Sequence, residues 1–148
     1  ALSNFGGVKR RMELLDTVNG IEVYDDFAHH PTAIDTTLEG ARKRLGERKL
    51  WAIIEPRSNT MRMGSHKDGL AHSARLADEV IWYQPEGLDW DLQPVIDASP
   101  NKAVVARSLD DIIQTVVAEA GEGDAVVIMS NGGFGGLHQK LLTALKSK

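Results

Sequence analysis

The chain has 148 residues, of which 42% are hydrophobic, and its 17 basic and 21 acidic residues give a net charge of -4. This length and composition suit one soluble domain with a single core, and a second full domain does not fit. The charge balance does not favour nucleic acid or an anionic membrane as the main partner. The absence of cysteine excludes disulfides, thiolate metal sites and thiol nucleophiles.

No apolar run approaches the roughly 20 residues that a membrane-spanning helix needs, and the opening ALSNFGGVKRR lacks the apolar core of a signal peptide. We therefore expect a soluble protein of the cytoplasm, which the lack of cysteine also suits. The opening is typical of the middle of a protein, so we expect this chain to be part of a longer polypeptide.

The pattern over residues 11–26 predicts a β-hairpin. Its tight turn is expected at Asn19-Gly20, because these two residue types accept the positive φ values that such a turn requires. Side chains alternate along a strand, so in the second arm Asp25 and Asp26 are expected to point to opposite faces. We expect Asp25 to be a structural residue.

A helix is predicted next, beginning at Pro31 and ending at Gly46. Its apolar stripe follows helical spacing: Ile34, Leu38, Ala41 and Leu45.

Strands and helices alternate over the rest of the chain. Buried strands are predicted by the runs KLWAIIEP (49–56), DEVIWYQ (78–84), KAVVARS (102–108) and DAVVIMS (124–130). Helices are expected at about 66–77, weakly over 91–99, after the capping box of Ser108 and Asp111, and over a last segment that carries Leu137, Leu141, Leu142 and Leu145. The fold class predicted is α/β, a Rossmann-like and mostly parallel sheet with helices on both faces and an N-terminal β-hairpin.

Ligands of such sheets bind beyond the carboxyl ends of the strands. This rule brings together the loops DDFAHHP (25–31), EPRSNTMRMG (55–64), YQPEG (83–87) and SNGGFGG (130–136). In the first loop, Asp25, Asp26, His29 and His30 suit metal ligation, acid-base chemistry or contacts with a nucleotide, and helix capping is the simpler alternative. A metal site that uses both aspartates is disfavoured because they face opposite sides.

The second loop carries many hydrogen-bond donors, which suit carboxylates or phosphates unless the loop is merely solvated. They are Arg57, Ser58, Asn59, Thr60 and Arg62. The glycines of SNGGFGG do not form a dinucleotide fingerprint, because His138 stands where the third glycine is required. We keep only the expectation that they allow close approach of the backbone to a ligand, or simply form a turn.

Several of these motifs together resemble the C-terminal domain of the Mur ligase family, the ATP-dependent amide ligases of peptidoglycan synthesis. They are GVKRRME before the hairpin, YDDFAHHP before the first helix and EPRSNTMRMG at a strand end, and the resemblance covers nearly the whole chain. EPRSNTMRMG and SNGGFGG are similar to the branch of the family that joins UDP-N-acetylmuramate to the tripeptide L-alanyl-γ-D-glutamyl-meso-diaminopimelate during cell-wall recycling.

The resemblance implies a three-domain enzyme in which this chain is the third domain. It implies that the first domain binds the UDP-sugar and the central one binds ATP and Mg²⁺, and no P-loop motif occurs here. The reaction implied is phosphorylation of the muramoyl carboxylate by ATP, followed by attack of the tripeptide amine on the acyl phosphate. The partners implied are UDP-N-acetylmuramate, the tripeptide, ATP and the enzyme's own N-terminal and central domains.

Roles for single residues also follow from the resemblance. It implies that Arg11 reaches the ATP phosphates, that Asp26 binds the ribose and that His29 lies beside the nucleotide. It implies that His30 contacts either the nucleotide or the amine substrate. The loop after the last strand touches the amine substrate in relatives, so the candidates there are Ser130, Asn131 and Phe134.

Two further inferences concern individual positions. We infer that Arg57 and Arg62 suit the several carboxylates of the tripeptide. Phe27 stands where relatives often carry tyrosine, so a hydroxyl contact at that position is in doubt.

Three alternatives remain open. A metal-dependent hydrolase would use Asp25, Asp26, His29 and His30, and a non-catalytic module would bind nucleotides or peptides. Within the family, another ligase would add an amino acid to UDP-N-acetylmuramate. We expect the isolated domain to have weak or no activity, because closure of the domains is what brings its groups to the acyl phosphate.

Overall fold

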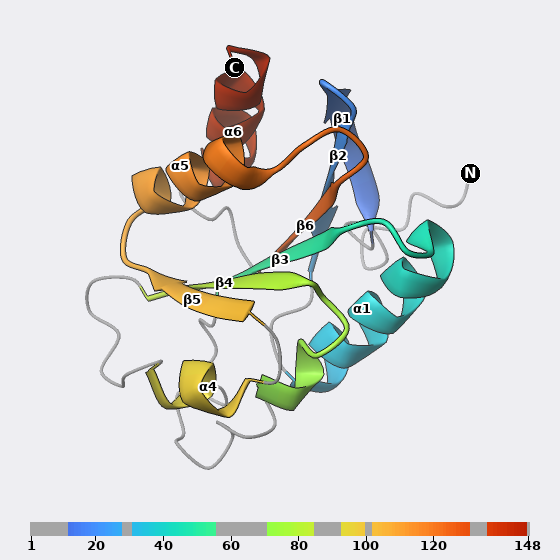
Figure 1. The fold of residues 1–148 in the computed structure, drawn as a ribbon, viewed down its shortest axis with the longest axis vertical. Coiled ribbons are helices and arrows are strands. Elements are labelled where there is room, and N and C mark those ends of the chain that lie inside the picture. Colours follow the sequence, from blue (N-terminus) through green and yellow to red (C-terminus); the bar gives the residue numbers. More distant parts are fainter. Residues whose placement is uncertain are drawn as a thin grey trace.

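The structure is a computed structural model, and it describes residues 12–27, 31–55, 71–84, 93–99, 102–130 and 136–147. Within these ranges six strands form one sheet in the order β1-β2-β6-β3-β4-β5 (Figure 1). They are β1 (Glu13–Val18), β2 (Ile21–Asp26), β3 (Leu50–Ile54), β4 (Glu79–Tyr83), β5 (Lys102–Ala106) and β6 (Ala125–Met129). Only the β1–β2 pair among these strands is antiparallel, so the predicted mostly parallel sheet is confirmed.

Helices cover both faces of this sheet (Figure 1). They are α1 (Pro31–Leu45), α4 (Gln93–Ala98), α5 (Leu109–Glu119) and α6 (Leu137–Lys146). α1 and α4 lie on one face, and α5 and α6 lie on the other. The α/β, Rossmann-like fold class is therefore confirmed.

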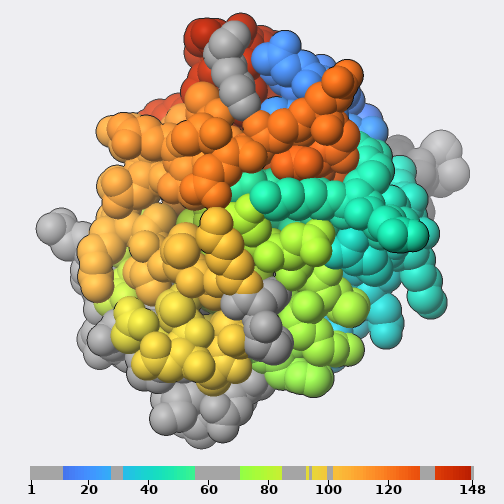
Figure 2. Space-filling view, in the orientation of Figure 1, coloured from blue at the N-terminus to red at the C-terminus, as the bar shows by residue number. Residues whose placement is uncertain are grey.

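The hairpin turn forms where the sequence predicts it. The φ angle is 53° at Asn19 and 80° at Gly20, and Val18 faces Ile21 across the turn. The side chain of Asn19 also donates to the carbonyl of Leu145 in α6, at 2.8 Å. The N-terminal hairpin and the C-terminal helix consequently lie side by side (Figure 2).

The sheet separates two apolar clusters, which explains why its strands are continuously apolar. Along β3, Leu50, Ala52 and Ile54 pack in the cluster under α1, whereas Trp51 and Ile53 pack in the cluster under α5 and α6. Side chains of a strand alternate between its faces, so a strand that is covered on both sides needs an apolar residue at every position.

The helix predictions hold with small changes. The expected stripe of α1 is buried, and the backbone at Gly46 is left-handed with a φ of 66°. At the start of α5, the Ser108 side chain accepts a hydrogen bond from the Asp111 amide at 3.2 Å, as the capping pattern predicts. α5 ends at Glu119, and Ala120 is its C-cap residue. Of the helix expected at about 66–77, residues 71–73 are helical, and residues before 71 lie outside the described ranges.

None of the helices in the described ranges is long and apolar enough to cross a membrane.

Gly20 and Gly40 make a matched pair for testing the hairpin turn. We predict that Gly20→Ala lowers the free energy of unfolding by at least about 1–2 kcal/mol, because an L-residue is strained at this positive φ and its Cβ would meet Glu122. Gly40→Ala, in an open position of α1, should raise it by about 0.5–1 kcal/mol. Urea denaturation measures both changes. An equal effect of the two substitutions would contradict the conclusion that the hairpin turn requires glycine at position 20.

The buried Tyr24 side chain should make the free energy of unfolding depend on pH in the alkaline range. Burial, and then a 2.8 Å hydrogen bond to Glu22, raise the pKa of Tyr24 above its usual value of 10.0. Stability linked to this group is therefore complete below pH 10.0 and is lost as pH rises through the raised pKa of the folded state. We expect Tyr24→Phe to reduce the slope of unfolding free energy against pH above pH 10.0, with no change in slope below about pH 9, in urea titrations. An unchanged alkaline slope would contradict this linkage.

Candidate functional site

The carboxyl ends of the central strands meet at one edge of the sheet, as the sequence predicts. Asp26 of β2 is paired with Met129 of β6, Met129 with Ile54 of β3, and Ile54 with Trp82 of β4. Because β6 lies between β2 and β3, the residue that follows it, Ser130, comes beside Asp26. The Ser130 amide donates to the Asp26 carbonyl at 3.2 Å.

Asp26 is the best-defined member of this edge. It is only 1% exposed, and the donors to its carboxylate include a backbone amide just before β1 and a side chain of α1. The Thr37 hydroxyl of α1 donates to Oδ1 at 3.1 Å, and the Met12 amide donates to Oδ2 at 2.9 Å. Met12 has a φ of 50°, a conformation that costs a non-glycine residue about 1–2 kcal/mol. The hydrogen bond to the carboxylate offsets part of this cost.

Asp25 turns to the other face, as predicted. Its Oδ1 lies 2.9 Å from Nε2 of His138, in the first turn of α6, and both side chains are largely buried. No side chain caps the start of α6, where Gly136 is left-handed with a φ of 80°. The carboxylate of Asp25 therefore supplies negative charge close to this helix N-terminus.

The opposite directions of Asp25 and Asp26 count against the alternative of a metal-dependent hydrolase that uses both carboxylates. β2 alone does not build a metal site from both carboxylates, because one is bonded to α1 and the other to α6. Within the described ranges there is no group of three or more His, Asp or Glu residues that would hold a metal ion.

Most other predicted site residues lie outside the described residues. These are Arg11, His29, His30, Arg57, Ser58, Asn59, Thr60, Arg62, Asn131 and Phe134. Their roles stay predictions. Asp26 and Ser130 are described, and they are adjacent and buried, while Phe27 next to them is 46% exposed.

Sequence reasoning missed the side chains that hold the two aspartates, Thr37 and His138. Thr37 carried a signal, because it is a polar residue on the buried face of α1, three residues after Ile34 and next to Leu38. His138 was considered only as the residue that breaks a glycine motif, and no local pattern links it to Asp25, 113 residues away.

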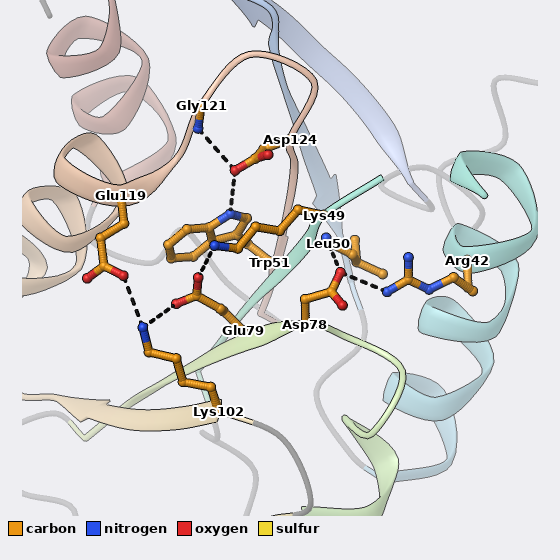
Figure 3. Close-up of polar contacts among 10 residues, drawn as sticks. All are labelled: Arg42, Lys49, Leu50, Trp51, Asp78, Glu79, Lys102, Glu119, Gly121 and Asp124. Carbon is orange, nitrogen blue, oxygen red and sulfur yellow. Dashed lines mark hydrogen bonds and ion pairs between the residues drawn. The ribbon is translucent and has the colours of Figure 1, made fainter. Parts of the chain in front are cut away.

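The amino edge of the sheet is different in kind, because its charged groups are bonded to one another (Figure 3). The buried carboxylate of Glu79 pairs with Lys49 and with Lys102, the latter at 3.2 Å. Lys102 also pairs with Glu119 at 3.1 Å. Hydrogen bonding to Glu119, and then to Glu79, raises the pKa of the Lys102 amine above its usual value of 10.5.

Two more carboxylates fasten the same edge (Figure 3). Asp124 accepts from the Trp51 indole and from the Gly121 amide, both at 3.0 Å. Asp78 accepts from the Leu50 amide at 2.8 Å and pairs with Arg42 at 3.0 Å. This edge therefore serves the fold, and the carboxyl edge is the better candidate for ligand chemistry.

Comparison with known proteins assigns the family. The model of the "Mur ligase, glutamate ligase domain" matches residues 10–132. The chain belongs to the Mur ligase family. It corresponds to the family's C-terminal domain, and it spans about a third of the length of two curated relatives that it matches over its whole length. The resemblance stated from the sequence motifs is thus confirmed.

One relative is the UDP-N-acetylmuramate–L-alanyl-γ-D-glutamyl-meso-2,6-diaminoheptandioate ligase of Escherichia coli K12, which is 48% identical over 100% of this chain and 33% of its own length. The crystal structure of a murein peptide ligase, Mpl, from Psychrobacter arcticus has a TM-score of 0.89 at 59% identity and is matched over 99% of this chain and 32% of that one.

Another crystal structure holds a domain, assigned to such a ligase from Haemophilus ducreyi, with a TM-score of 0.78 and 42% identity over 90% of this chain and 98% of that one. A domain of this kind therefore folds as a separate chain. The MurF ligase of Thermotoga maritima shares the fold, with a TM-score of 0.64 at 15% identity over 94% of this chain and 30% of that one, and was solved with ADP.

The Asp25–His138 pair is testable in the isolated domain. We predict that Asp25→Ala and His138→Ala each lower the free energy of unfolding by about 1–3 kcal/mol, because each removes the largely buried hydrogen bond that joins β2 to α6. A double-mutant cycle in urea should give a coupling of at least about 1 kcal/mol. Glu39→Gln, at an exposed position of α1, is the control and should change stability by less than about 0.5 kcal/mol. Additive effects of the two substitutions would show that the pair does not stabilise the fold.

Proposed function

We propose that this chain is the C-terminal domain of a ligase that uses ATP to join UDP-N-acetylmuramate to L-alanyl-γ-D-glutamyl-meso-diaminopimelate. The observation that carries the proposal is the similarity along the entire chain to ligases of that name and to the Mpl structure. Identity of this level over a whole domain supports a shared substrate class as well as a shared fold.

The nucleotide half of the site is proposed at the end of β2. The Asp26 carboxylate accepts from neutral donors, a hydroxyl and an amide, and a ribose hydroxyl is a donor of the same kind. The residues present therefore fit the sugar of a nucleotide. We propose that Arg11 binds the ATP phosphates and that His29 and His30 lie beside the nucleotide.

The amine substrate is proposed at the neighbouring strand ends. Ser130, Asn131 and Phe134 follow β6, and we assign to them contacts with the tripeptide. Donors after β3 are assigned to the carboxylates of the tripeptide, since guanidinium groups bind carboxylates through paired hydrogen bonds. These donors are Arg57, Ser58, Asn59, Thr60 and Arg62.

The reaction proposed has two steps. An oxygen of the muramoyl carboxylate takes the γ-phosphoryl group of ATP, and ADP leaves. The alanine nitrogen of the tripeptide then attacks the acyl carbon, the bond from that carbon to the phosphate oxygen breaks, and the nitrogen loses a proton. Mg²⁺, when bound, neutralises phosphate charge, and we assign it to the central domain. The share of this domain is to orient the ribose and the amine and to exclude water from the acyl phosphate.

The identity of the amine substrate tests the proposal. In the full-length enzyme we expect phosphate release that depends on both UDP-N-acetylmuramate and the tripeptide. The ratio kcat/KM for the tripeptide should exceed that for L-alanine by at least about 100-fold, because polar groups built to hold the tripeptide are left unpaired by the smaller amine. A preference for L-alanine would instead identify a ligase that adds a single amino acid.

The isolated domain provides the matched control for this experiment. It should release no phosphate from ATP above background. Efficient turnover by this domain alone, or tightly held metal with hydrolytic activity, would contradict the proposed division of labour.

A further inference from the structure

Thr37 is a buried hydroxyl without an assigned role. It lies in the second turn of α1, is 7% exposed, and is flanked by the buried stripe of Ile34 and Leu38. A buried hydroxyl is unfavourable unless it is hydrogen-bonded, and valine would fill the same volume without that requirement. The hydrogen bond to Asp26 is therefore what makes threonine suitable here.

Asp26 in turn depends on its donors for its orientation. The residue is almost completely covered, so water does not replace a lost partner easily. The Thr37 hydroxyl of α1 and the amide of Met12, just before β1, bond to different oxygens of the carboxylate. Together they fix the plane of the group and hence the directions in which it accepts a further hydrogen bond.

We propose that Thr37 is a positioning residue of the nucleotide site, which orients the Asp26 carboxylate toward the ribose through its hydroxyl. The same carboxylate holds the amide of Met12, the residue that follows Arg11. The Asp26 carboxylate thus serves as the acceptor for the ribose and also fixes the backbone next to Arg11, which we assign to the ATP phosphates. This inference rests on the proposed function, in which Asp26 binds the ribose.

The test compares ATP with 2′,3′-dideoxy-ATP in the full-length enzyme. The wild-type enzyme should have a KM at least about tenfold lower for ATP than for the analogue, because only ATP offers hydroxyls to Asp26. Thr37→Val should raise the KM for ATP about tenfold, change kcat less than about threefold, and leave the KM for the analogue unchanged. The ratio of the two KM values should then fall toward one.

Two variants on the same helix serve as controls. Thr37→Ser keeps the hydroxyl and should retain the wild-type ratio within about twofold. Thr36→Val makes the same chemical change at the neighbouring exposed position and should also leave the ratio unchanged. Thermal unfolding of each variant shows whether the fold is kept.

The outcomes separate the two proposals. If Thr37→Val keeps the wild-type ratio, or raises both KM values equally, Thr37 has only a structural role and the positioning proposal is wrong. Asp26→Asn tests the assignment beneath it, because an amide can still accept from Met12 and donate to the threonine hydroxyl while losing its charge. If Asp26→Asn also keeps the wild-type ratio, the ribose contact in the proposed function is wrong, whatever Thr37 does.

Discussion

The position of β6 in the sheet is the constraint on which the rest of the structure depends. β6 pairs with β2 on one side and with β3 on the other, and all of its residues are buried. β6, the last strand of the described residues, thus completes the centre of the sheet between β2, which begins 104 residues earlier, and β3, which begins 75 residues earlier. Neither apolar cluster closes without it, because residues from β6 contribute to both.

This arrangement also builds the candidate site. With β6 in the middle, Ser130 comes beside Asp26, and the carboxyl ends of β2, β6 and β3 lie side by side. Adjacent aspartates at the end of β2 then bond to helices on opposite faces, Asp26 to α1 and Asp25 to α6. The end of β2 is held from both sides, which suits a position that must present a ligand contact precisely.

The two edges of the sheet differ in how their charged side chains are paired. On the amino edge, ion pairs connect Lys49, Glu79, Lys102 and Glu119 (Figure 3). The charged groups of these four side chains are thus bonded to one another. The motifs YDDFAHHP, EPRSNTMRMG and SNGGFGG begin at the carboxyl ends of β2, β3 and β6. Since the chain is about a third of the length of its curated relatives, the proposed catalytic centre requires other domains to face this edge.

Local patterns were enough to establish much of the fold from the sequence. The positive φ values at Asn19 and Gly20, the buried stripe of α1 and the cap at Ser108 each depend on residues only a few positions apart. Alternation along β2 also sufficed to send Asp25 and Asp26 to opposite faces. The motifs that resemble the Mur ligases are equally local, and the family was identified from them.

Strand order and the partners of the site residues came only from tertiary structure. No pattern in the sequence near β6 predicts that it pairs with both β2 and β3. No pattern near Asp25 or Asp26 predicts that they bond to His138 and Thr37. Asp25 and His138 are 113 positions apart in the sequence, and Asp26 and Thr37 are 11 apart. The Trp51 indole likewise donates to Asp124, which lies 73 positions away. Sequence periodicity reports which side of an element is buried, whereas a specific long-range hydrogen bond depends on how the elements pack together.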